Sequence, residues 1–190
     1  MNRSRAKPPA NAIEAWHWLG IEGATAHEAV KVKAGQTLRQ PPPLSLCYVG
    51  MHASVDIMDA LSYAPGPILC RVRLWGAKAE GTDKICAEYR RCDWLVDATP
   101  ALRRWARWSA LRVAHLWAAP PVVLRYLRTG DESIRAAARA AARDAASDAA
   151  RAEAWAAARV AAWDAQRAEL LRLVEMLHRG EEIPLAIGYD

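Results

Sequence analysis

The chain has 190 residues, of which 53% are apolar and 25% are charged, with a formal net charge of +5. This length suits one ordinary domain or a small core with an appendage, and the composition excludes a wholly disordered chain. No apolar run reaches the roughly 20 residues that cross a bilayer, and the basic start lacks the apolar stretch of a secretory signal. We therefore expect a cytoplasmic protein without a membrane partner.

The charge is divided unevenly along the chain. Residues 1–130 carry 18 Lys and Arg against 10 Asp and Glu, whereas residues 131–190 carry 8 Arg against 11 Asp and Glu. We expect four segments: a flexible basic arm (1–10), an α+β core (11–98), a helical pair packed on the core (99–130), and a long helix with a tail (131–190). The basic part would favour an acidic partner, nucleic acid included.

The first core segment, residues 11–19, has two interpretations. Asn11 is a suitable N-cap for a short helix that Gly20 would end. Alternatively, Trp16 and Trp18 alternate with their neighbours as in a strand over residues 15–19.

Residues 44–76 are the stretch around which we expect the core to be built. The pattern predicts a strand over residues 44–49, a helix over 55–63 capped by Ser54, and a strand over 68–74. In the last strand Cys70 falls on the apolar face and Arg71 and Arg73 on the opposite face. Residues 76–83 are predicted to form a loop, and residues 84–96 a strand pair or one long bent strand, with Glu88 and Arg90 on a single face.

The C-terminal part is predicted to be helical. Thr99 and Pro100 are strong helix-start residues, and the helix over 100–118 would turn Leu102, Trp105, Val113 and Leu116 inward. A shorter helix over 122–127 would end at Gly130. From 131 to 179 the chain is rich in Ala and contains no Gly or Pro, which predicts one long helix, or two separated near Ser147. Its apolar C-terminal third would dock on the core or on a second copy, giving a homo-oligomer.

The fold class that follows is α+β: a small, mostly antiparallel sheet with short helices, then an all-helical C-terminal part with one long Ala/Arg-rich helix. No C-x-x-C pair, H-E-x-x-H spacing or Gly-rich phosphate loop is present, so we predict no metal site and no cofactor from the motifs.

Three marks in the core resemble the ADP-ribosyltransferases of the poly-ADP-ribose polymerase and diphtheria-toxin type. They are Trp16-His17, the run GMHAS followed by a helix ending at Tyr63, and the strand that runs into Gly76. The resemblance implies a sheet that binds NAD, with His17 holding the ribose and Glu88 as the catalytic glutamate. It also implies that His52, Ser54 and Tyr63 line the cofactor cleft.

A second resemblance extends over nearly the whole chain from Trp16. The runs GMHAS, DALSYAPG and CRVRLWG, followed by LRRWARW and an Ala/Arg helix, resemble an uncharacterised family encoded by phages and prophages. This implies a phage accessory context in the cytoplasm of a bacterial host.

Our leading hypothesis is a phage- or prophage-derived accessory protein that binds a macromolecular partner, with a protein of a host defence system as a candidate. One alternative is an ADP-ribosyltransferase-like enzyme that uses NAD. A second is a nucleic-acid binder whose basic face comprises Arg71, Arg73, Arg90, Arg91, Arg103, Arg104 and Arg107. Simpler interpretations exist for single residues, because a helix cap alone explains Ser54 and a packed core histidine explains His17.

Overall fold

The computed structural model describes residues 2–25, 30–145 and 150–188, with residues 150–161 described by their backbone alone. The chain forms two compact units, Met1–Thr99 and Pro100–Asp190. Helices and antiparallel strands are both present, which confirms the α+β class. Within the described ranges, no helix combines the length and the apolar character that a membrane span requires.

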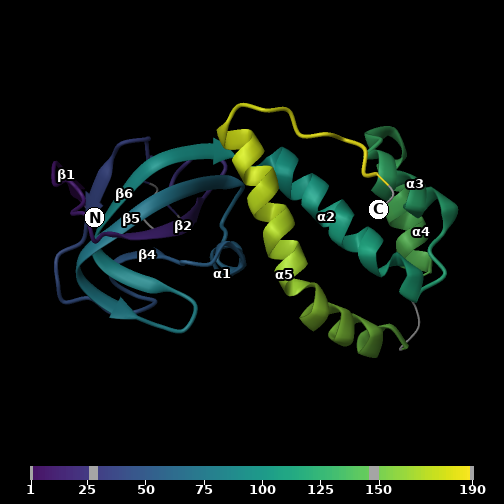
Figure 1. Ribbon diagram of the computed structural model, residues 1–190, viewed down its shortest axis with the longest axis horizontal. Coiled ribbons are helices and arrows are strands. Elements are labelled where there is room, and N and C mark those ends of the chain that lie inside the picture. Colours follow the sequence, from purple (N-terminus) through teal and green to yellow (C-terminus); the bar gives the residue numbers. More distant parts are fainter. Residues whose placement is uncertain (1, 26–29, 146–149, 189–190) are drawn as a thin grey trace. The chain divides into compact units, whose positions relative to one another are not determined.

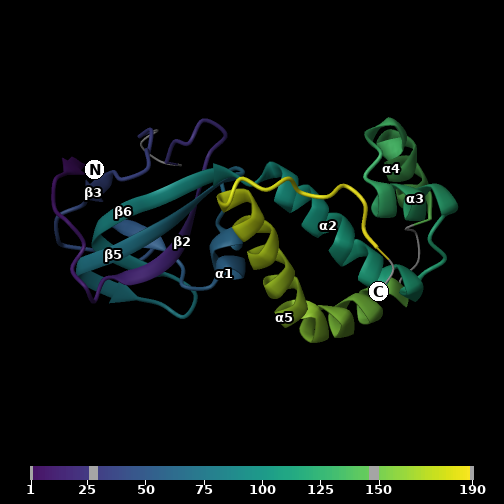
Figure 2. The same cartoon turned by 45° about the horizontal axis from the view of Figure 1, so that its top comes forward.

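The first unit is built on one antiparallel sheet of six strands (Figure 1). Its order is β1-β3-β6-β5-β2, and β4 also pairs with β6. Figure 2 shows one end of this order, with β6, β5 and β2 side by side. The strands are β1 Asn2–Ser4, β2 Ile13–Leu19, β3 Thr37–Arg39, β4 Met51–Ala53, β5 Ile68–Glu80 and β6 Ile85–Asp97.

The sheet curls until β4 meets β2. One edge of β6 pairs with β5, and its other edge pairs first with β4 and then with β3. Ser54, directly after β4, joins β2 through two backbone hydrogen bonds with Trp16, of 2.7 and 3.0 Å. The sheet therefore has an enclosed inner face, to which residues far apart in the sequence contribute.

A bulge at Gly76 bends the β5–β6 hairpin. Trp75 pairs with Tyr89 and Lys78 with Ala87, so two residues of β5 lie opposite Glu88 alone. Gly76 has φ +84°, and a Cβ there would lie 2.9 Å from the Cβ of Glu88. Glycine is therefore required for this bulge, which increases the local twist and helps the hairpin to curl.

Alternation along the strands fills the inner face with apolar side chains. Adjacent strand residues point to opposite faces, so Val72 and Leu74 point inward while Arg71 and Arg73 point outward. Cys70 is buried on the inner face, as predicted. The buried inner core is made of Ala15, Leu19, Val32, Leu38, Met51, Ala53, Cys70, Val72, Leu74, Ile85, Ala87 and Cys92.

The structure decides both open alternatives in the core. Residues 13–19 form β2, which pairs along its whole length with β5, and not a helix capped by Asn11. Residues 85–97 form one long strand. In residues 13–19 the ladder of backbone hydrogen bonds and the buried face gained from β5 outweigh the local helix signals. Residues 85–97 stay one strand because β5 pairs with them from Ile85 to Asp97.

Three boundaries in the 44–83 region differ from the predictions. Residues 44–49 form a turn with a single bridge between Ser45 and Val49, and the strand β4 begins only at Met51. Helix α1, Ile57–Ser62, is capped by Asp56, whose Oδ1 accepts the Met58 N–H at 2.7 Å. Ser54 is instead held by its backbone in the bridge to β2, so the prediction that it caps the helix is wrong. The expected loop over 76–83 starts later, because β5 continues to Glu80.

The elements described after Asp97 are helices. They are α2 Thr99–Val113, η1 Ala114–Leu116, α3 Pro121–Thr129, η2 Glu132–Ile134, α4 Arg135–Asp144 and α5 Ala150–His178. The segments α4 and α5 agree with the two-helix alternative, although Ser147 lies outside the described residues. Leu116 is exposed and not inward, because α2 ends at Val113 and the helical periodicity does not extend to it.

The C-terminal third of α5 packs within its own unit. Leu173 is buried with Ala101 of α2 and Ile183 of the tail. The Trp105 Nε1–H donates to the Gln166 carbonyl at 2.8 Å, so the C-terminal part of α5 lies next to the first half of α2 (Figures 1 and 2). Leu170, Leu173 and Val174 of this third are thus buried in a single chain, whereas Trp163 is exposed.

Candidate functional site

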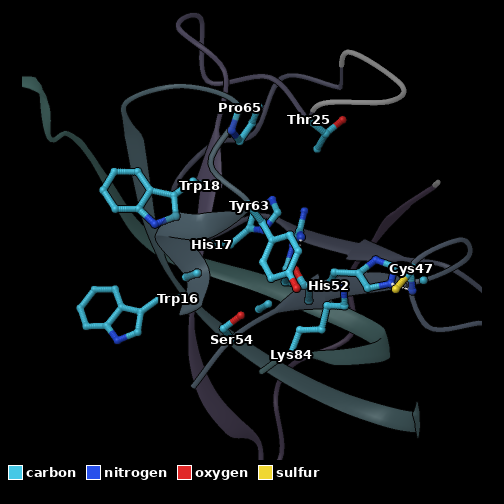
Figure 3. A pocket seen from close by; sticks show the side chains of 14 residues that line it. Trp16, His17, Trp18, Thr25, Cys47, His52, Ser54, Tyr63, Pro65 and Lys84 are labelled. Atoms are coloured by element: carbon cyan, nitrogen blue, oxygen red, sulfur yellow. Dashed lines mark hydrogen bonds between the residues drawn. The ribbon is translucent and has the colours of Figure 1, made fainter. Parts of the chain in front are cut away.

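A cavity of about 380 Å³ lies in the first unit (Figure 3). Its size is within the range of about 300–1,000 Å³ typical of small-molecule sites. The lining residues come from β2, the 44–54 segment, α1 and β6, together with Thr25, Pro65 and Lys84. Figure 3 shows the Tyr63 ring at the centre, and the indoles of Trp16 and Trp18 turned away from it. The polar and aromatic residues of the lining that could contact a ligand include His17, His52, Ser54, Tyr63, Lys84 and Arg90.

His17 reaches the cavity from the inner face of β2. It lies opposite Cys70 in the β2–β5 ladder and is half-buried. Burial lowers the pKa of the His17 imidazole well below its usual value, and the nearby charges of Arg90 and His52 lower this pKa further. His17 is consequently neutral at pH 7 and can accept or donate one hydrogen bond per ring nitrogen.

Arg90 reaches the cavity from β6 and is only 5% exposed. Its Nη1 donates to the His52 carbonyl at 2.7 Å. Burial lowers the pKa of the Arg90 guanidinium to about 10, so the group still carries its charge at pH 7. This is a correction: Arg90 was predicted on the same basic face as Arg91, but adjacent strand residues point to opposite sides, and Arg90 shares the inner side with Cys92.

Tyr63 and Lys84 form the rim. Tyr63 is the C-cap residue of α1 and is 51% exposed. The Lys84 Nζ lies 4.2 Å from the centre of the Tyr63 ring, a cation–π distance, and the Tyr63 hydroxyl donates to Asp83. A hydrogen bond with Cys47 is the main cause that raises the pKa of Lys84, and a hydrogen bond with Tyr63 raises this pKa further. The rim therefore presents a positive charge next to an aromatic ring.

His52, in β4, lines the cavity and is bonded to the turn that precedes this strand. Its Nε2 accepts the Cys47 N–H at 3.1 Å, and Figure 3 shows the His52 ring beside the Cys47 side chain. Cys47 has φ +75°, a left-handed conformation that is uncommon for residues other than glycine. The hydrogen bond to His52 helps to hold this turn.

Glu88 does not join the other residues of the predicted NAD site. The structure places His17, His52, Ser54 and Tyr63 around one cavity, but Glu88 is absent from its lining. Its carboxylate pairs with Arg39 at 2.8 Å and approaches the Ala77 N–H at 3.5 Å. The hydrogen bond from Arg39 is the main cause of the lowered pKa of Glu88. The Gly76 bulge thus directs Glu88 to Arg39 and away from the cavity.

The predicted basic face is largely neutralised by carboxylates. On the outer face of the sheet Arg71 pairs with Glu14 at 2.5 Å, and Asp93 binds both Arg73, at 2.7 Å, and Arg91, at 3.4 Å. These residues therefore form ion pairs and not an unpaired basic strip.

Of the three helical arginines in the predicted basic face, two are not on an open surface. Arg103 is exposed. Arg104 lies within 3.5 Å of Glu169 on α5, and Arg107 is buried and donates to the Leu127 and Leu185 carbonyls. Both side chains are on the packed side of α2, because this side must contact α5, α3 and the tail.

Sequence reasoning missed Arg90, Cys47 and Thr25 as cavity residues. For Arg90 a signal was available. Arg90 and Cys92 lie two positions apart in a strand and so share a face, and an apolar Cys92 indicates that this face is the buried one. Cys47 and Thr25 carry no such signal, because turns bring them to the cavity. Among the described residues, no three His, Cys, Asp or Glu side chains are grouped to hold a metal ion.

Comparisons with known proteins give no family for this chain: no family model matches it, and neither a curated protein nor a solved structure shows a match.

Proposed function

We propose that the protein is a phage- or prophage-derived accessory protein that acts in the cytoplasm of a bacterial host by binding a macromolecular partner. The partner class that we propose is a protein, with the components of host defence systems as the first candidates. The recognition site in this proposal is the cavity of the first unit.

The observation that carries this proposal is the combination of an accessible rim and an interior of polar groups. Tyr63 is half-exposed at the rim, whereas Arg90 and His17 lie inside. A protruding group of a partner can thus stack on the Tyr63 ring and reach hydrogen-bonding groups beneath it. The paired arginines of the outer face give a nucleic-acid partner no comparable support.

Site-specific photo-crosslinking tests this proposal. A benzophenone amino acid replaces Tyr63 in one variant and Ile21, which is exposed and does not line the cavity, in a matched control. In host cells, the Tyr63 variant should form a discrete crosslinked product with a protein that the Ile21 variant does not form. Equal products from both positions, or none from Tyr63, would contradict the cavity as the recognition site.

A second candidate function is an ADP-ribosyltransferase-like activity with NAD, and with it an ADP-ribosyltransferase-like arrangement of the sheet. Its support is that His17, His52, Ser54 and Tyr63, which the resemblance assigns to the NAD cleft, line one cavity. Glu88 lies outside this cavity, so the residue that would position the ribose for transfer is missing from the group.

Calorimetric titration with NAD separates the two candidates. Binding that is lost in His17→Ala, together with NAD cleavage that is lost in Glu88→Gln, would favour the enzyme. Absence of NAD binding would rule it out and leave the partner-binding proposal unaffected.

A further inference from the structure

The first unit contains a buried positive charge without a carboxylate partner. Arg90 is 5% exposed, and no ion pair joins its guanidinium to any Asp or Glu of the described residues. Its one hydrogen bond among these residues runs from Nη1 to the His52 carbonyl at 2.7 Å. The N–H groups on Nε and Nη2 are thus left without a protein acceptor in the described part of the chain.

A buried charge of this kind is costly unless something compensates it. Moving a charged group out of water carries a large free-energy penalty, which a paired anion offsets. No Asp or Glu near Arg90 supplies this anion, and His17 is neutral. Cys92 is the neighbouring group that could carry negative charge, because a hydrogen bond with Cys70, first, and the Arg90 charge lower its pKa, while burial raises it. Its Sγ lies 3.3 Å from the Trp94 carbonyl oxygen and forms no ion pair with the guanidinium.

The cavity gives an external anion access to this charge. Arg90 and His17 line the cavity in the interior, and Lys84 adds a second positive charge at the rim. The carboxylate of Asp83 accepts the Tyr63 hydroxyl, and Asp83 is not a lining residue. A volume of about 380 Å³ accommodates an oxyanion with one attached ring.

We propose that the cavity binds an oxyanion, a phosphate or carboxylate group, on the free N–H groups of Arg90, with an attached apolar or aromatic part against Tyr63. The planar guanidinium matches both anions because two parallel N–H groups can bind two oxygens. Lys84 attracts the anion at the entrance, and the neutral His17 donates or accepts one hydrogen bond beside it. The inference rests on the proposed function, since the anion is the group that the protein partner presents.

The test uses the whole 190-residue chain and three small probes of similar shape: phenyl phosphate, benzoate and phenol. Binding is measured by calorimetry at constant ionic strength. At least one of the two anions should bind about tenfold more tightly than phenol, which corresponds to about 1.4 kcal/mol. The stronger of the two shows whether the site prefers a phosphate or a carboxylate. Equal weak binding of all three probes would overturn the proposal.

Variants locate the anion on Arg90. Arg90→Met should remove the preference for the anions, and Lys84→Gln should reduce it by a few-fold. Arg73→Gln is the matched control, because Arg73 pairs with Asp93 on the outer face, and it should leave the preference unchanged. If Arg90→Met is unfolded, the nitrogen-15 chemical shifts of the Arg90 guanidinium in the wild type replace it. These shifts should move with phenyl phosphate or benzoate, and unchanged shifts would overturn the proposal.

Failure of this inference and failure of the proposed function have different signatures. A Tyr63 crosslink without anion preference would mean that the partner presents a neutral group. Anion binding without a crosslink would mean that the cavity is a site for a small free anion.

Discussion

Arg90 and Arg107, the two buried arginines among the described side chains, show how differently a fold can use the same residue type. Arg107 is 6% exposed and donates to two backbone carbonyls, those of Leu127 at 3.1 Å and Leu185 at 2.8 Å. It thereby joins α2 to the C-terminal end of α3 and to the tail, where a cation also interacts favourably with the helix dipole.

Arg90 is as deeply buried as Arg107, but it donates to a single backbone carbonyl, that of His52, and it lines a cavity. The surroundings of Arg107 are closed, since a Cβ on Gly130 would lie 2.7 Å from its Cζ. The difference indicates that Arg107 stabilises its unit, whereas Arg90 is kept for a ligand at a cost in stability. Four measurements test this comparison.

The largest effect is expected for Arg107→Met. Two buried carbonyls would lose their donors, and each unsatisfied group costs about 1–3 kcal/mol. We expect a loss of about 3 kcal/mol in the free energy of unfolding, measured by urea denaturation followed by far-ultraviolet circular dichroism. Arg103→Met, on an exposed position of the same helix, is the control and should change it by less than about 0.5 kcal/mol. Equal effects of the two substitutions would refute the structural role of Arg107.

The next effect is expected for Gly130→Ala. Gly130 has φ +67°, and its new Cβ would also meet the Arg107 guanidinium, so we expect a loss of about 2 kcal/mol. Gly180→Ala separates the two causes, since Gly180 has φ +74° but open space around it. Gly180→Ala should lower the free energy of unfolding by only about 1 kcal/mol, which is the cost of placing a residue with a side chain at positive φ. A Gly130 effect no larger than the Gly180 effect would mean that the Arg107 contact is unimportant.

A smaller effect concerns pH and the cavity. The pKa of His17 is lowered in the folded state by burial and by Arg90 and His52. Below about pH 6.5 the unfolded chain therefore binds a proton that the folded chain does not, and the stability falls as the pH decreases. Urea denaturation at several pH values between 7.5 and 5 should show this fall, and His17→Gln should reduce it. The carboxylates with lowered pKa values, Glu88 among them, lose their contribution at lower pH, below their ordinary pKa near 4.5.

If the fall between these pH values were identical in His17→Gln and wild type, the imidazole would not be the group that titrates.

The smallest effect, and the strongest contrast with Arg107, is expected for Arg90→Met without ligand. The substitution removes a buried charge that lacks a counter-ion and loses one hydrogen bond, to the His52 carbonyl. These effects oppose each other, so the free energy of unfolding should change by less than about 1 kcal/mol in either direction. A loss as large as that of Arg107→Met would show that Arg90 has a structural role after all.

Local patterns in the sequence were sufficient for the α+β class and for the faces of the strongest elements. The alternation of Cys70, Val72 and Leu74 with two arginines correctly indicated which side of β5 is buried. The helix-start residues at 99–100 and the terminal Gly130 mark the ends of real helices. These features depend on neighbours within a few residues, which a sequence displays directly.

Tertiary structure alone decided the site. The bridge between Trp16 and Ser54 joins segments that are 38 positions apart, and it encloses the inner face on which His17 and Arg90 meet. The Gly76 bulge and the ion pair with Arg39 separate Glu88 from the residues that resemblance grouped with it. Strand order, bulges and long-range ion pairs depend on partners distant in sequence, and no local periodicity records them.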